Sequence, residues 1–294
     1  MNMQYEFDIS GLKIKVHTDI SVAISEAFKP FILQNVKKAD VDIFFDSMST
    51  LKKPQGQCVY EEFFFKIYKK ENKFYMCFYD LKEEMKLYAI AKFISDSEIK
   101  VNYLKQYACN ISSIRSCFMH IAFEELLMRH KRFMLHASFI QTKYGGLVFS
   151  GPSGIGKSTQ ADLWKKYKNA EIINGDRTIL KQQDSYWIGF GSPYAGSSQY
   201  FVNKSCKIVA IIFLEKGREN KLEKIPMIDS FKKIYSQMLI NVWDLKYIEV
   251  LSEGIEKMVK NIAVYKYTCT PDKDSVEYLD KFLDKEICCG GRTD

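Results

Sequence analysis

Glycine, lysine and hydroxyl residues stand at fixed spacing in the segment 151–159, which reads GPSGIGKST and fits the pattern GxxxxGK[ST] in full. Glycines at these positions let backbone N–H groups line a concavity of anion size, and a helix starting at the end of the segment adds its positive dipole. In this pattern the lysine reaches the β- and γ-phosphates, and the next hydroxyl binds Mg²⁺. The segment therefore predicts binding of a nucleoside triphosphate, through Gly151, Ser153, Gly154, Ile155, Gly156, Lys157, Ser158 and Thr159.

The residues that accompany this segment narrow the class of protein. The run 203–205, Asn-Lys-Ser, lacks the Asp of a guanine-reading NKxD motif, and no long apolar strand ending in paired acids, as in motor ATPases, is evident. Asp176 stands instead at the end of the next predicted strand, AEIIN, and places a carboxylate beside the loop within one βαβ unit. Such a carboxylate can hold Mg²⁺ or take the proton from an attacking hydroxyl. A strand-end Asp can also be a simple turn or cap residue.

His136 is the second candidate for chemistry. It lies in the apolar run FMLHASF, which is expected to form a hairpin with the strand that feeds the loop. A lone histidine in such a strand is more often a satisfied buried residue, but this neighbourhood favours a functional role. The other three histidines have no such surroundings and are expected to be structural or surface residues.

The elements that must position these residues fall into two halves. Short aromatic and β-branched runs from residue 1 to about 105, separated by turn signals, predict an antiparallel β-rich module with one helix near 20–35. Apolar residues at helical spacing over 110–130 predict a helix that connects the halves. The second half then predicts two strands, the loop, a helix near 157–167 and further strands, with helices near 229–243 and 273–283.

Composition excludes several other classes. Of the 294 residues, 47% are hydrophobic and 27% charged, as in a globular protein rather than a disordered chain. No segment is long and apolar enough to cross a bilayer, and the eight cysteines form no metal-binding spacing or disulfide framework, so we expect a cytoplasmic protein. The net charge of +7 is spread along the chain, which makes nucleic acid an unfavoured partner.

With these residues in order, the part from about 130 to 220 resembles the HPr kinase/phosphorylase family, which is similar to phosphoenolpyruvate carboxykinases in its nucleotide core. The resemblance implies an ATP- and Mg²⁺-dependent serine kinase, whose functional residues match His136, Lys157, Ser158, Asp176 and Glu215 of this chain. The family has two consecutive aspartates where this chain has Gly175-Asp176, so one role is vacant, shared or filled from elsewhere. The family's substrate-loop signature is also absent from the equivalent segment, 191–198.

We therefore expect an α/β fold with a P-loop core and a separate N-terminal β-rich domain. The predicted division is 1–108 for the β-rich domain, which could recognise the substrate, 109–287 for the kinase domain and 288–294 for a tail. The expected activity is transfer of the γ-phosphoryl group of ATP to a hydroxyl, with a serine of a protein or peptide favoured as acceptor.

Within this activity, Lys157 would hold the phosphates, Asp176 would act as base or magnesium ligand together with Ser158, and His136 would tune Asp176. Arg177 and Glu215 could contact substrate or phosphate. The alternatives are a kinase of a free amino acid or sugar, and a non-catalytic module that binds a partner when ATP is present. The resemblance also makes a homo-oligomer possible.

Overall fold

The structure is a computed structural model that describes residues 3–82, 85–196 and 198–288. The chain forms two compact units. Unit 1 holds the residues up to His130 together with the later segment Asn241–Ile248, and unit 2 holds Lys131–Ile240 and the residues from Glu249 onward. Unit 1 is therefore discontinuous in sequence, because its last segment follows most of unit 2 along the chain.

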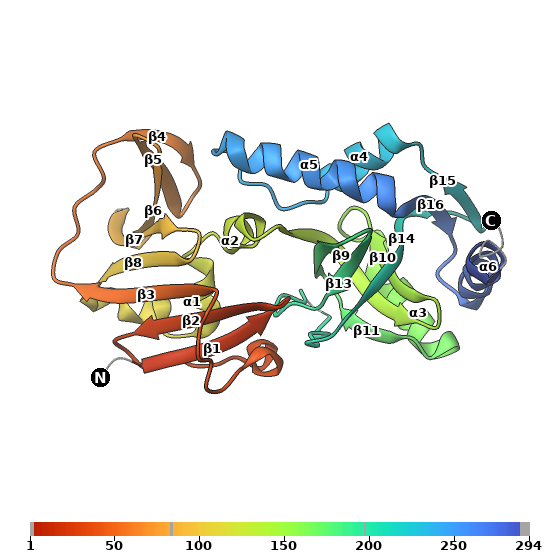
Figure 1. The fold of residues 1–294 in the computed structure, drawn as a ribbon, viewed down its shortest axis with the longest axis horizontal. Helices are drawn as coiled ribbons and strands as arrows, with labels where there is room; N and C mark the ends of the chain where they lie inside the picture. Colours follow the sequence, from red (N-terminus) through yellow and green to blue (C-terminus); the bar gives the residue numbers. More distant parts are fainter. Residues whose placement is uncertain (1–2, 83–84, 197, 289–294) are drawn as a thin grey trace. The chain divides into compact units, whose positions relative to one another are not determined.

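Unit 1 is built on eight strands. These are β1 (Met3–Ile9), β2 (Leu12–Thr18), β3 (Val41–Met48), β4 (Gln57–Glu61), β5 (Phe65–Lys70), β6 (Lys73–Asp80), β7 (Lys86–Ser95) and β8 (Glu98–Leu104). They form one sheet in the order β1-β2-β3-β8-β7-β6-β5-β4 (Figure 1). The period-two alternation of the sequence is partial; it is clearest in β2 and β8, whose alternate residues are buried on one face of the sheet.

Short helices cover the apolar face of this sheet. They are η1 (Glu26–Phe31), η2 (Lys105–Ile111), α1 (Ile114–Met119) and α2 (Phe123–Arg129). The rings of Phe7, Phe28 and Phe118 meet edge to face or tilted in the core, with centroids 5.2–5.9 Å apart. From the later segment, Trp243 packs on Tyr60 at 4.9 Å and on Phe65 at 6.3 Å between ring centroids. The returning segment thus contributes to the aromatic packing of unit 1.

Four expectations for the first half were wrong in detail. The sheet is mixed, because β3 pairs in parallel with both β2 and β8. The helix expected near 20–35 is only the 3₁₀ turn η1, where Pro30 lacks an N–H for a longer helix. The helix expected over 110–130 is broken at Ala122, whose backbone is left-handed with a φ of 46°. Unit 1 also extends past the expected boundary at 108, since α1 carries Phe118 into its core.

Unit 2 carries the second sheet. Its strands are β9 (Arg132–Thr142), β10 (Gly145–Ser150), β11 (Glu171–Asn174), β12 (Arg177–Gln183), β13 (Tyr186–Phe190), β14 (Ser205–Lys216), β15 (Lys221–Lys224) and β16 (Ala263–Cys269). Its helices are α3 (Lys157–Lys168), α4 (Met227–Tyr235), α5 (Leu245–Asn261), which starts in unit 1, α6 (Lys273–Leu283) and the π-helix η3 (Asp284–Cys288). The long helix α5 was not predicted, and residues 289–294 of the expected tail lie outside the described residues.

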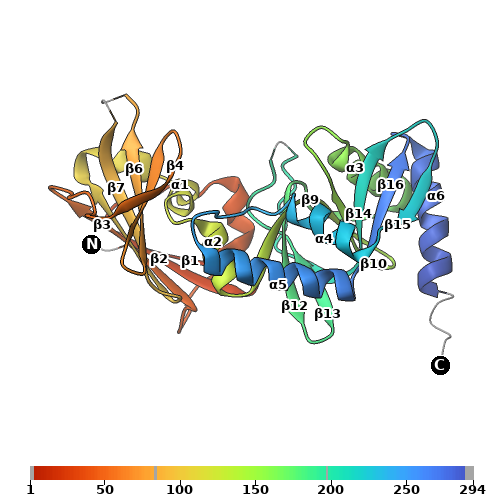
Figure 2. The same cartoon turned by 90° about the horizontal axis from the view of Figure 1, so that it is seen from above.

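The sheet of unit 2 runs in the order β10-β9-β12-β13-β14-β16-β15, with β10 also paired to β14 and β11 to β9. Three of its strands, β10, β14 and β16, are parallel neighbours. Their carboxyl ends therefore lie at one edge of the sheet, where loops after parallel strands form ligand sites. Helices α3 and α6 pack together on this sheet around the buried Trp164 (Figure 2). No helix among the described residues is long and apolar enough to span a membrane.

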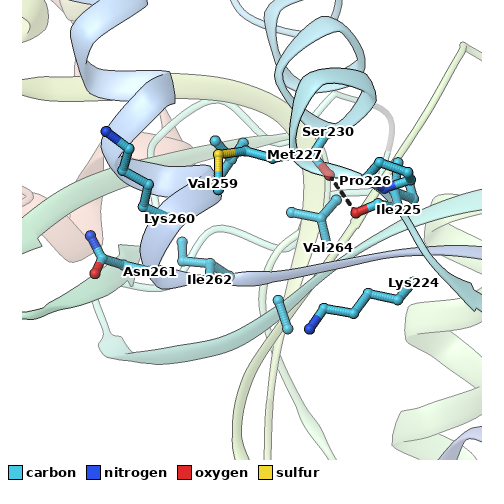
Figure 3. A pocket seen from close by; sticks show the side chains of 11 residues that line it. Lys224, Ile225, Pro226, Met227, Ser230, Val259, Lys260, Asn261, Ile262 and Val264 are labelled. Carbon is cyan, nitrogen blue, oxygen red and sulfur yellow. Dashed lines mark hydrogen bonds between the residues drawn. The ribbon is translucent and has the colours of Figure 1, made fainter.

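A hollow of about 550 Å³ lies at the amino end of β16, between the start of α4 and the end of α5 (Figure 3). We call it the α4–α5 hollow. Apolar residues such as Met227 and Val264 line it, and Lys224 and Lys260 are also among its lining residues. Its serine, Ser230, is turned inward and donates a hydrogen bond of 3.2 Å to the Ile225 carbonyl.

Candidate functional site

The segment 151–159 connects the end of β10 to the start of α3, as expected. Gly151, Gly154 and Gly156 adopt φ values of 138°, 75° and 114°, a region that favours glycine. A Cβ atom added to Gly154 or Gly156 would meet no atom within 4 Å, so the space beside the loop is open at these two residues. An open glycine loop that leads into a helix N-terminus has the form of an anion cradle.

Lys157 is the first residue of α3 and is 7% exposed. Its Nζ donates hydrogen bonds to the carbonyls of Gly151 at 2.9 Å and Pro152 at 3.1 Å. The pKa of Lys157 is lowered, mainly because the ammonium is buried. The charge of Asp176 opposes this shift, and the charge of Arg177 adds to it. A buried ammonium whose hydrogen-bond partners are carbonyls is a favourable place for an added anion. The hydroxyl residues that follow, Ser158 and Thr159, are exposed.

The carboxylate of Asp176 lies between the imidazole of His136 and the guanidinium of Arg177. Its Oδ1 lies 3.1 Å from Nε2 of His136, and Nε of Arg177 lies 3.2 Å from its Oδ2. Burial and the charge of Lys157 lower the pKa of His136, while Asp176 opposes this shift, so the imidazole is neutral at pH 7. The structure thus brings together three of the predicted residues and places Lys157 close enough to affect them electrostatically.

Strand β9 creates this arrangement because it lies between β10 and β12. His136 pairs with Arg177 of β12 on one edge, and the next residue, Ala137, pairs with Ser150 of β10 on the other. The backbone N–H of Ala137 also donates to the carbonyl of Asp176 at 2.9 Å. The turn that carries Asp176 and the last residue before the glycine loop are therefore attached to adjacent positions of one strand.

Asn174 organises the turn and was not singled out in the sequence. It is fully buried, and its Oδ1 accepts hydrogen bonds from the N–H groups of Asp176 at 2.9 Å and Arg177 at 2.7 Å. Its Nδ2 donates to the carbonyls of Ser192 at 3.0 Å and Tyr194 at 3.3 Å. One amide thus ties the carboxylate turn to the loop 191–198. Its only signal in the sequence is a polar residue directly after the apolar pair Ile172-Ile173.

The loop 191–198 packs directly on the carboxylate turn, with Ser197 outside the described residues. A Cβ atom on Gly175 would lie 1.7 Å from Oγ of Ser198, so Ser198 fills the space that a second aspartate would need. A Cβ atom on Gly196 would lie 3.0 Å from Cγ of Asp176. Two glycines therefore allow this close approach between loop and carboxylate.

Glu215 lies elsewhere in the site. It stands near the end of β14, and its carboxylate accepts a hydrogen bond of 3.3 Å from Thr268 of β16. Together with Gly154 and Gly156 it lines a hollow of about 290 Å³. The structure groups Glu215 with the glycine loop, whereas Asp176 and His136 group with each other.

No protein-family model matches the chain, and no curated protein matches it in sequence. Among solved structures, the chain is similar to the HPr(Ser) kinase/phosphatase from Coxiella burnetii, with 16% sequence identity and a TM-score of 0.31. That similarity covers 54% of this chain and 99% of the other.

Proposed function

We propose that this protein is an ATP-dependent kinase that transfers the γ-phosphoryl group to a hydroxyl, with a serine of a protein or peptide as acceptor. One observation carries the proposal. An open glycine loop with a buried ammonium, Lys157, lies beside a carboxylate, Asp176, that is oriented by His136 and Arg177. Phosphoryl transfer needs these two parts, an anion cradle and a group that positions the attacking hydroxyl.

Each residue of the site has a role in this reaction. The backbone N–H groups of 151–156 and the ammonium of Lys157 hold the phosphates, and the lysine exchanges its carbonyl partners for phosphate oxygens. The oxygen of the acceptor hydroxyl bonds to the γ-phosphorus while Asp176 takes the proton of that hydroxyl. The bond between the γ-phosphorus and the oxygen of the β-phosphate breaks, and ADP leaves with that oxygen. His136 and Arg177 hold the carboxylate in the orientation that this proton transfer requires.

Mg²⁺ would neutralise phosphate charge during the transfer. The described residues contain no group of three His, Cys, Asp or Glu side chains able to hold a metal ion. A nucleotide-bound Mg²⁺ needs only one or two protein ligands, because phosphate oxygens and waters complete its shell. The exposed hydroxyl of Ser158 and the carboxylate of Asp176 would supply them.

Phosphate transfer can be tested with Mg-ATP and candidate serine peptides, followed by mass spectrometry for the gain of one phosphate. We expect transfer by the native protein and loss of at least about 100-fold in rate for Asp176→Asn, because the general base is removed. Asp162→Asn changes an exposed carboxyl on α3 in the same way and should retain full transfer. Full transfer by Asp176→Asn would contradict the assignment, and phosphate gain on a free amino acid or sugar alone would replace the peptide acceptor.

A further inference from the structure

The hollow that contains Glu215 has a defined place in the fold. It lies where the parallel strands β10, β14 and β16 end, and we call it the strand-end hollow. It is lined by the glycine loop, the start of α3 and the ends of β14 and β16 with the residues that follow them. Its lining includes Gly154, Thr159, Glu215, Lys216, Thr270 and Pro271. Ligands of α/β sheets bind in crevices of this kind, outside the carboxyl ends of the strands.

The sheet order gives the loop two different sides. β10 pairs with β9 along one edge and with β14 along the other. Asp176 and His136 belong to the β9 side, and the strand-end hollow belongs to the β14 side. A polyphosphate that lies along the loop with its reacting end at Asp176 therefore has its other end at this hollow.

The chemistry of the hollow suits a nucleoside. The largely buried Leu214 and Cys269 are among its lining residues and can offer apolar surface to a planar base. Glu215, Lys216 and Thr270 also line it and carry hydrogen-bonding groups suited to ribose hydroxyls. A volume of about 290 Å³ is close to the lower end of the range for ligand sites, which begins at roughly 300 Å³.

The wall of the hollow is held in place by buried hydrogen bonds. Gln160 of α3 is 2% exposed, and its Nε2 donates to the Thr270 carbonyl at 3.3 Å and to Oγ of Ser275 at 3.1 Å. The N–H of Thr270 donates to Oδ1 of Asn220 at 3.1 Å. The residues after β16 are thus fixed to both α3 and the β14–β15 connection, and a preformed wall lowers the entropic cost of binding.

We propose that the strand-end hollow binds the nucleoside part of the triphosphate whose phosphates lie on the glycine loop. This inference rests on the proposed function and extends it from the phosphates to the base and ribose. It assigns α3, through Thr159, and the segment after β16, through Thr270 and Pro271, as the surfaces that distinguish ATP from bare polyphosphate.

Calorimetric titration with two probes, ATP and inorganic tripolyphosphate, both with Mg²⁺, tests the inference without measuring activity. Pro271→Phe and Pro271→Trp fill the hollow with rings of two sizes, at a residue that lines it outside the glycine loop. We expect each variant to bind ATP at least tenfold more weakly and tripolyphosphate within twofold of the native protein. Asp162→Phe adds the same ring to an exposed position of α3 outside the hollow and should leave both affinities unchanged.

The other possible results overturn either the inference about the hollow or the proposed function. Unchanged ATP affinity in both filled variants, or equal loss of ATP and tripolyphosphate binding, overturns the inference about the hollow. Lys157→Ala tests the proposed function separately from the hollow. It should lower the affinity for both ATP and tripolyphosphate, because Lys157 belongs to the glycine loop. Native protein that binds neither probe would overturn the function and the hollow together, whereas ATP binding that is normal in Lys157→Ala would overturn the function alone.

Discussion

The α4–α5 hollow and the strand-end hollow, both in the described part of unit 2, differ in size and in what surrounds them. The α4–α5 hollow is nearly twice as large, about 550 Å³ against about 290 Å³, yet it lies at the amino end of β16 with two lysines beside it. The strand-end hollow adjoins an open glycine loop, a helix N-terminus and the carboxyl ends of three parallel strands. Under the proposed function, strand direction and neighbouring backbone groups, more than volume, mark the place where the phosphates bind.

Lysine substitutions at the glycine loop and at the α4–α5 hollow give the largest expected contrast. Lys157→Met should lower the rate of phosphoryl transfer by at least about 100-fold, because a buried cation in a low-dielectric site is lost. Lys224→Ala and Lys260→Ala remove cations from the α4–α5 hollow and should change transfer by less than twofold. If Lys224→Ala or Lys260→Ala lowered the transfer rate and the ATP affinity as much as Lys157→Met does, the glycine loop would not be the preferred phosphate site.

Asn174 allows a sharper test on the carboxylate side of the loop. Asn174→Ala removes the acceptor for two N–H groups of the turn, so we expect kcat to fall about tenfold and the free energy of unfolding by about 1–3 kcal/mol. ATP affinity should stay within twofold, since the glycine loop is not bonded to Asn174. A purely structural role would instead weaken ATP binding and kcat together as the fold loosens.

The conservative variant Asn174→Asp separates the two functions of this amide. It keeps an acceptor for the N–H groups of Asp176 and Arg177 but loses the donor to the carbonyls of Ser192 and Tyr194. We expect it to recover most of kcat while the KM for the acceptor rises several-fold, because the loop 191–198 is released. Steady-state kinetics with varied acceptor concentration measures both constants.

Gly175→Ala should have a smaller effect in the same region. The added methyl group must displace Ser198, whose Oγ occupies its position. We expect the KM for the acceptor to rise a few-fold, while ATP affinity is unchanged. Gly175→Ala combined with Ser198→Gly, which removes the obstructing hydroxymethyl group, should restore the native KM, and a failure of this rescue would show that the packing of loop on turn is unimportant.

The pH dependence of stability gives the smallest effect. The pKa of His136 is lowered in the folded protein below its ordinary value of 6.5, so the unfolded chain binds a proton more readily. The stability that the neutral imidazole contributes is thus present above about pH 6.5 and is lost as the pH falls through the lower folded pKa. Urea unfolding between pH 5 and 8 should show this loss in the native protein and less of it in His136→Gln, and NMR titration should place the pKa of His136 below 6.5.

Local patterns predicted much of the site and less of the fold. The glycine loop between strand and helix and the helix α6 at Lys273–Leu283 follow from short-range spacing, and the structure shows both elements there. The parallel pairing of β3 was missed because period-two alternation gives the faces of a strand and not the direction of its neighbour. Asn174 was missed because its importance comes from partners about 18–20 residues away, in a loop without regular structure.

The discontinuity of unit 1 has a consequence for how the protein folds during synthesis. Domains usually fold in turn as they leave the ribosome, the first before the second. Here the aromatic packing of the first unit lacks Trp243 until most of unit 2, its segment Lys131–Ile240, has been made. A ribosome-bound chain ending near residue 135 should therefore hold an incompletely packed sheet, and protease resistance of that sheet should rise only once the segment 241–248 has emerged.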